Sequence, residues 1–188
     1  TTLATDSISA AVRSNVISNI KNNLGKFNQS FSISKLLMNI DSASSAIDSS
    51  SVNVLMEKRI LPTSTREVSY ILSFGNSFYH PHDGHMSVIS SNTFKYLDPT
   101  DTITKDVFIK DDGNGRLSFY QKVGMSDKLV LQNAGTVEYE KGIVRITQVK
   151  IYSPIDSPEI KVYAVGKNQR YVSVREKVIF NDYTVDTS

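Results

Sequence analysis

The chain has 188 residues, with 21 basic and 19 acidic side chains and no cysteine. A net charge of +2 requires neither a nucleic acid nor an anionic membrane as partner. The lack of cysteine excludes disulfides, thiolate catalysis and cysteine-ligated zinc. No apolar run reaches the roughly 18–20 residues that a membrane-spanning helix needs. The length and composition are typical of a globular chain with one domain, or with one domain and an arm.

A first helix is predicted by apolar residues that recur every four positions. The stripe consists of Ile8, Val12, Val16, Ile20 and Leu24. Thr5 or Asp6 can cap the start, and Gly25 stands where a left-handed residue ends many helices. We therefore expect one buried face, packed on this chain or on a partner, and one solvated face.

A second, shorter helix is predicted after a capping Ser32 or Ser34. Its apolar side is formed by Leu36, Leu37 and Ile40. Six serines then fall between Asp41 and Asn53. Serine-rich segments favour turns and hydrogen bonds from side chain to backbone, so we expect a surface connection here.

Strands dominate the rest of the sequence. Alternation over 52–57 predicts a strand, and Pro62 stops the pattern because proline cannot donate to a β-ladder. We place a boundary there, with a helical arm and connecting strand in 1–62 and a β-rich domain in 63–188. Further strands are predicted at 67–74, 103–110, 117–123, 128–132, 136–140, 143–151, 159–165 and 171–180.

The turns between these strands indicate how they are connected. Residues 111–115 and 140–142 carry Asn and Gly in places that suit tight hairpins. No helical pattern separates the strands, so a parallel sheet with crossover helices is not expected. The predicted fold class is α+β, with short N-terminal helices followed by a mainly antiparallel sheet or sandwich.

All three histidines lie within six residues, as His80, His82 and His85. Neutral imidazoles bind zinc, nickel or iron, so a metal-dependent hydrolase is one reading. Against it, Asp83 precedes Gly84, which breaks the H-x-H-x-D-H order of metallo-hydrolases, and no distant histidine remains as a further ligand. The other reading is a solvated loop tip.

Other catalytic motifs fail at specific positions. A calcium loop that starts at Asp111 or Asp112 would need a carboxylate at its twelfth residue, where Lys122 and Val123 stand. Glycine-rich phosphate loops and a G-x-S-x-G elbow are absent from the sequence. We therefore predict no catalytic, cofactor-binding or metal-binding residue, no small-molecule substrate and no enzyme.

A short charged run, Glu57-Lys58-Arg59, ends the strand before Pro62. Arginine suits the recognition of carboxylates across an interface, although such a run is also typical of a solvated or protected strand edge. The candidate interface residues are Ile8, Val12, Val16, Ile20, Lys58 and Arg59.

The order of several segments resembles a known family. They are 24–27 (LGKF), 31–36 (FSISKL), 46–62 (AIDSSSVNVLMEKRILP), 90–94 (SSNTF), 111–117 (DDGNGRL) and 135–143 (GTVEYEKGI). Together they resemble the large baseplate wedge subunit of T-even-type contractile-tailed bacteriophages, a relative of the baseplate J-like proteins. The resemblance spans about residues 8–180 and implies the carboxy-terminal portion of such a subunit.

The resemblance implies a structural role in the virion. Such subunits are made in the host cytoplasm, pair with copies of themselves, join neighbouring wedge proteins and rearrange when the tail contracts. A homodimer that also contacts other baseplate proteins is therefore expected, with neither nucleic acid nor membrane as partner. The alternative is a carbohydrate- or receptor-binding β-sandwich of a phage tail, which would show exposed aromatic side chains on one sheet face.

Overall fold

The computed structural model describes residues 2–24, 30–52, 54–62, 66–154, 159–167 and 170–172. The chain divides into two compact units. The helical unit contains the described residues up to Leu55 together with strand β12, and the β unit runs from Met56 to Lys167. The boundary expected at Pro62 stays a prediction.

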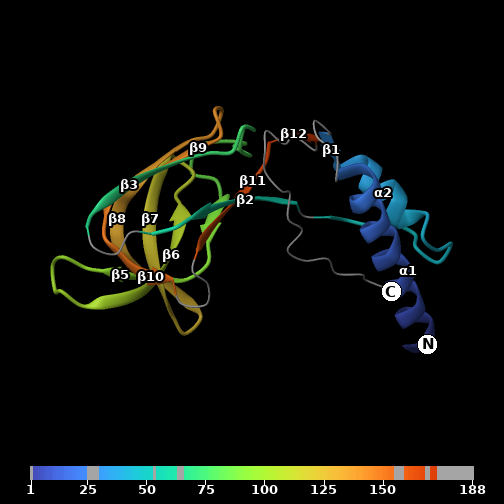
Figure 1. Ribbon diagram of the computed structural model, residues 1–188, viewed down its shortest axis with the longest axis horizontal. Helices are drawn as coiled ribbons and strands as arrows, with labels where there is room; N and C mark the ends of the chain where they lie inside the picture. The colour runs from blue at the N-terminus through green and yellow to red at the C-terminus, as the bar shows by residue number, and fades with distance from the viewer. Residues whose placement is uncertain are drawn as a thin grey trace. The chain divides into compact units, whose positions relative to one another are not determined.

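The helical unit is built from two helices and a small sheet (Figure 1). Its elements are α1 (Thr2–Asn19), the π-helical turn η1 (Ile20–Leu24), β1 (Ser30–Ser32), α2 (Ile33–Asp41) and β12 (Arg170–Val172). Strands β1 and β12 pair antiparallel, with Phe31 opposite Tyr171. This pairing joins the start of the chain to a segment that follows the whole β unit.

The first helix begins earlier than its expected caps. Thr5 and Asp6 lie inside α1, so the expectation that either caps the helix is wrong. A capping residue has an extended backbone outside the helix, whereas these two are helical. The expected Gly25 terminator lies outside the described residues.

The second helix and the serine-rich connection match their predictions. Ser32 occupies the N-cap position with φ −122° and ψ 119°, although its hydroxyl forms no capping hydrogen bond. The buried side of α2 carries Ile33, Leu36 and Ile40. Residues 42–52 form turns and irregular structure, in which the Ser44 hydroxyl accepts a hydrogen bond from the Ala46 N–H at 3.2 Å.

The β unit is a curled antiparallel sheet that approaches a barrel (Figure 1). Its strands are β2 (Leu55–Ile60), β3 (Val68–Ser73), β4 (Ile89–Ser91), β5 (Phe94–Leu97), β6 (Thr104–Asp111), β7 (Arg116–Val123), β8 (Ser126–Glu138), β9 (Ile143–Val149), β10 (Ile151–Pro154) and β11 (Ile160–Val165). The main path is β2-β11-β4-β6-β7-β8-β9-β3, and β5 joins β6 to β10 off this path. The predicted α+β class, with helices followed by a mainly antiparallel sheet, is confirmed.

Alternation of inward and outward side chains explains the core of this sheet. Along β6, Val107 and Ile109 are fully buried while Phe108 between them is only half-buried. On β7, Leu117 and Phe119 are fully buried. A period of two places successive side chains on opposite faces of a strand, so the apolar residues line one continuous interior.

Two predicted strands, 128–132 and 136–140, are one long strand in the structure. β8 continues through Asn133, which has φ 57°, and the pairing of β7 with β8 shifts register around Phe119. At Gly135 a Cβ would overlap the backbone of Arg145 on β9. This bulged, glycine-containing stretch bends the strand without ending it, because a bulge increases local twist and glycine allows close approach.

Other strand predictions differ in their bounds. The strand expected at 52–57 begins later, as β2, and the strand expected at 143–151 divides into β9 and β10 at Lys150. Gln148, with φ 46°, marks the irregular end of β9. Strands β4 and β5 lie on either side of residues 92–93. Of the strand expected at 171–180, residues 173–180 lie outside the described residues.

A short segment, residues 74–79, joins two parts of the β unit that are distant in sequence. The Phe78 N–H donates to the Tyr139 carbonyl at 2.7 Å, at the end of β8. The Tyr79 N–H donates to the Val165 carbonyl at 2.9 Å, at the end of β11. Phe78 is fully buried and forms a β-bridge with Gly166. The segment therefore ties the β8–β9 hairpin to β11 and positions the histidine loop that follows it.

Candidate functional site

The apolar stripe of α1 is used within the helical unit, where α1 packs against α2 (Figure 1). Val12 is buried, and Ile8, Val16 and Ile20 are half-buried. The Asn15 side-chain amide donates to the Asn39 carbonyl of α2 at 3.4 Å. The stripe thus has a partner in its own unit, while its half-buried members keep part of their surface exposed.

Lys58 and Arg59 both lie on β2, where the arginine is held by carboxylates of its own chain. The Arg59 Nε donates to Glu57 Oε1 at 2.7 Å, and its Nη1 donates to Glu159 Oε2 at 2.9 Å. The hydrogen bond and the charge of buried Glu57 raise the pKa of the Arg59 guanidinium, and Glu159 adds to the effect. Because Glu159 directly precedes β11, this arrangement supports the β2–β11 pairing. Lys58 is half-buried.

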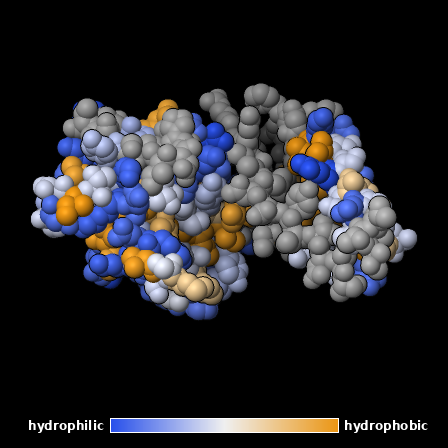
Figure 2. All heavy atoms as spheres, turned by 90° about the horizontal axis from the view of Figure 1, so that it is seen from below, coloured by the Kyte–Doolittle hydropathy of each residue, from blue (hydrophilic) through white to orange (hydrophobic). Residues whose placement is uncertain are grey.

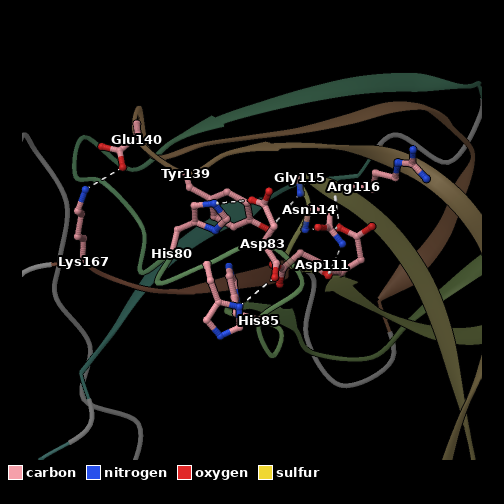
Figure 3. A network of polar contacts seen from close by, with 12 residues as sticks. His80, Asp83, His85, Asp111, Asn114, Gly115, Arg116, Tyr139, Glu140 and Lys167 are labelled. Carbon is pink, nitrogen blue, oxygen red and sulfur yellow. Dashed lines mark hydrogen bonds and ion pairs between the residues drawn. The ribbon is translucent and has the colours of Figure 1, made fainter.

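Two of the three histidines, His80 and His85, pack around the ring of Tyr139 (Figure 3). The His80 ring stacks on the Tyr139 ring, with 4.3 Å between centroids and 2° between planes. The His85 ring meets both of them edge-on, at 4.9 Å from His80 and 5.2 Å from Tyr139. His82 lies 6.4 Å from His85 and is exposed. The predicted solvated loop therefore holds two of its histidines in a packed position.

Each imidazole has one nitrogen near an oxygen. His85 Nδ1 lies 2.6 Å from the Met86 carbonyl, and His82 Nδ1 lies 2.9 Å from the Asp83 carbonyl, so each of these nitrogens donates. His80 Nε2 lies 3.3 Å from Asp83 Oδ1. Within the described part of the chain, no three His, Asp or Glu side chains are arranged to hold a metal ion.

Beside this group, Asp111 is a buried acceptor of hydrogen bonds (Figure 3). Its Oδ1 accepts from the N–H groups of Val88 and Ile89, both at 2.8 Å, and from the Ser87 hydroxyl at 2.7 Å. Its Oδ2 accepts from the Tyr139 hydroxyl at 2.7 Å. The carboxylate thereby fixes the entry into β4 and the position of the Tyr139 ring.

Burial raises the pKa of the Tyr139 hydroxyl well above its ordinary value of 10.0, and the Asp111 carboxylate raises it further. Both effects oppose ionisation, because a phenolate here would be poorly hydrated and would face a carboxylate. Tyr139 therefore stays a neutral donor. The sequence contained a signal for this arrangement, since alternation along β6 places Asp111 on the same inward face as Val107 and Ile109.

The hairpin between β6 and β7 brings its tip against the histidine loop. The Gly84 N–H donates to the Gly113 carbonyl at 3.1 Å, and a Cβ at Gly113, which has φ 72°, would overlap the backbone of His85. Asp112 Oδ1 accepts from the N–H groups of Asn114 and Arg116 at 2.8 and 3.0 Å. The carboxylates of Asp111 and Asp112 thus both form hydrogen bonds within the fold, and the prediction of a hairpin is confirmed.

The outer face of the β unit carries charged pairs and isolated apolar side chains. Asp127 binds both Lys110 and Lys122, and these two hydrogen bonds lower the pKa of its carboxyl. Figure 2 shows hydrophobic residues dispersed among hydrophilic ones on the face that it presents. Strongly exposed apolar residues of the β unit include Ile71, Met86, Ile103 and Met125. None of the helices in the described residues is long and apolar enough to cross a membrane.

A protein-family model, described as baseplate structural protein gp6, C-terminal domain III, matches residues 1–59. The match supports a structural protein of the phage tail baseplate. The matched residues contain α1, α2 and most of β2, so the likeness to this family lies mainly in the helical unit. No curated protein matches the chain.

The match extends over 59 of the 188 residues and supports a structural role in a phage baseplate. The match ends close to the boundary between the two units, so the β unit is characterised by its fold alone.

Proposed function

We propose that this chain is a structural subunit of a phage baseplate wedge, made in the host cytoplasm and assembled into the tail. In this proposal it is the carboxy-terminal portion of a baseplate J-like wedge protein, forms a homodimer and contacts neighbouring wedge proteins during assembly and contraction. The observation that carries the proposal is the family match over residues 1–59, which covers both helices of the helical unit.

The candidate interface residues take distinct parts in this proposal. The half-buried side chains of Ile8, Val16 and Ile20 offer apolar surface to a partner, whereas Val12 is buried within the helical unit. Lys58 and Arg59 mark β2, where the 46% exposed Arg59 side chain can meet a carboxylate of a neighbour in addition to its own.

Sedimentation velocity of the chain, alone and with purified wedge proteins, tests the proposal. We expect a concentration-dependent dimer in the micromolar range of specific but moderate interfaces, and co-sedimentation with a wedge protein. Arg59→Ala should weaken co-sedimentation, whereas Arg116→Ala, an exposed arginine of β7, serves as the matched control. A strict monomer that binds none of the wedge proteins would contradict the proposal.

One observation favours a second candidate, a carbohydrate-binding surface on the sheet. Phe108 and Tyr120 lie opposite each other on β6 and β7 and are both half-buried, with ring centroids 6.3 Å apart. Lys110 Nζ lies 5.5 Å from the Phe108 ring. Exposed aromatic faces can stack on sugar rings through their apolar bodies. Glycan-array binding that Tyr120→Ala abolishes would support this candidate, and an array without signal would dismiss it.

A further inference from the structure

Strand β3 ends the main path of the sheet and leaves one edge without a partner among the described residues. The Phe74 N–H donates to the Gly142 carbonyl, so the even-numbered residues of this stretch direct their backbone groups toward β9. Backbone groups alternate in direction along a strand. The N–H and C=O groups of Ile71 and Ser73, in the part of β3 that pairs regularly with β9, therefore point to the outer edge.

This edge carries neither charge nor proline, two of the usual protections against pairing, and its pairing with β9 is irregular between Val68 and Tyr70. Exposed edges commonly carry charged residues or proline, which disfavour association. β2, at the other end of the path, carries Lys58 and Arg59, whereas Val68–Ser73 contains no charge and no proline. The Ile71 side chain is 64% exposed, between exposed Ser69 and Ser73. An uncharged edge with an exposed β-branched residue at its centre is suited to pairing with another strand.

We propose that β3 pairs antiparallel with β3 of a second copy, about a two-fold axis through Ile71. This inference rests on the self-association in the proposed function and specifies its site. Each Ile71 then faces Ile71 of the second copy, and each Ser69 faces Ser73 of the second copy. Because opposite residues of an antiparallel pair share a face, outward side chains meet outward ones, and buried Leu72 meets half-buried Tyr70.

The register favours a second copy as the occupant. A two-fold interface uses the same patch twice, so a charged residue on the axis would face the same charged residue of the second copy. Here the opposed residues are serine, isoleucine, tyrosine and leucine, and beyond them Glu67 faces Gly75 of the second copy. The facing Ile71 residues exchange both backbone hydrogen bonds and bury the exposed side chain, which joins the two sheets into one.

A cysteine cross-link tests both the site and the register. The chain has no cysteine, so Ile71→Cys introduces a single thiol. In the proposed pair the two Cα atoms are about 5.5 Å apart, within the roughly 4.4–6.8 Å that disulfides span. We expect rapid formation of a disulfide-linked dimer on mild oxidation. Ile103→Cys, at a 58% exposed position outside β3, is the control and should form no disulfide-linked dimer.

Sedimentation velocity of charged variants provides a second measurement. Ile71→Lys places two like charges opposite each other and should raise the dimer dissociation constant about tenfold or more. Ile103→Lys should leave it unchanged. A wild-type chain that stays monomeric overturns both this inference and the self-association beneath it. A wild-type dimer that neither Ile71 variant affects overturns the β3 pairing alone and leaves the proposed function standing.

Discussion

Asp111→Ala should strongly destabilise the β unit. The substitution removes the acceptor for the N–H groups of Val88 and Ile89 and for the Tyr139 hydroxyl. Each buried donor that loses its partner costs about 1–3 kcal/mol. Ser87 is exposed and can bond to water instead. We expect a loss of about 4 kcal/mol, a large part of the 5–15 kcal/mol by which domains are stable.

Urea denaturation followed by far-UV circular dichroism measures this loss. With a slope of about 2 kcal/mol per molar urea, the midpoint should fall by about 2 M. Asp111→Asn keeps one acceptor oxygen and should cost less than half as much. The neighbouring Asp112 provides a matched control, because it accepts two backbone hydrogen bonds on the exposed side of the same turn. Asp112→Ala should cost about 1 kcal/mol or less.

The comparison between the two aspartates decides the interpretation. If Asp111→Ala and Asp112→Ala lower the midpoint equally, burial of the Asp111 hydrogen bonds does not determine their contribution, and the reasoning fails. Hydrogen exchange of the Val88 and Ile89 amides localises the effect. These amides should lose protection in Asp111→Ala and keep it in Asp112→Ala.

Three further outcomes are expected. Gly113→Ala should lower the free energy of unfolding by about 1–3 kcal/mol more than Gly124→Ala does, as measured by thermal unfolding. Both glycines have positive φ, but only at Gly113 would an added Cβ overlap neighbouring backbone atoms. Equal losses of stability in the two variants would refute this. Hydrogen bonds from Lys105 and Thr100 lower the pKa of Asp98 to about 2, so its stabilisation should disappear as the pH falls from about 4 to 2, and Asp98→Asn should flatten that part of the profile. Because the pKa of Tyr139 is raised, the unfolded state ionises first above pH 10; stability should therefore decrease there, and a similar decrease in Tyr139→Phe would contradict the assignment.

The regular parts of the fold could be predicted because their side chains alternate or recur with a clear period. The apolar positions of α1 and the alternation through β3, β6 and β7 are visible in the sequence, and the structure confirms these elements. The ends of elements were less predictable. Thr5 and Asp6 are good capping residues by type, yet α1 continues through both, because residue type alone does not fix where a helix begins.

The histidine loop shows what the sequence could not establish. Spacing identified three clustered imidazoles, but the tyrosine on which His80 stacks is 59 positions away, at the end of β8. Only the tertiary fold brings Tyr139 and Asp111 next to the loop. The same limit applies to β8. Asn133 and Gly135 predicted a break between two strands, whereas in the structure they lie at a bend within one strand, next to the β9 backbone.

The pairing of β1 with β12 has a consequence for the order in which the protein forms. All strands of the β unit lie between these two partners along the chain, so that unit can fold as soon as β11 has been synthesised. β1, made much earlier, must wait for β12 before it gains its hydrogen-bonded neighbour. The helical unit is therefore completed last, although its helices leave the ribosome first.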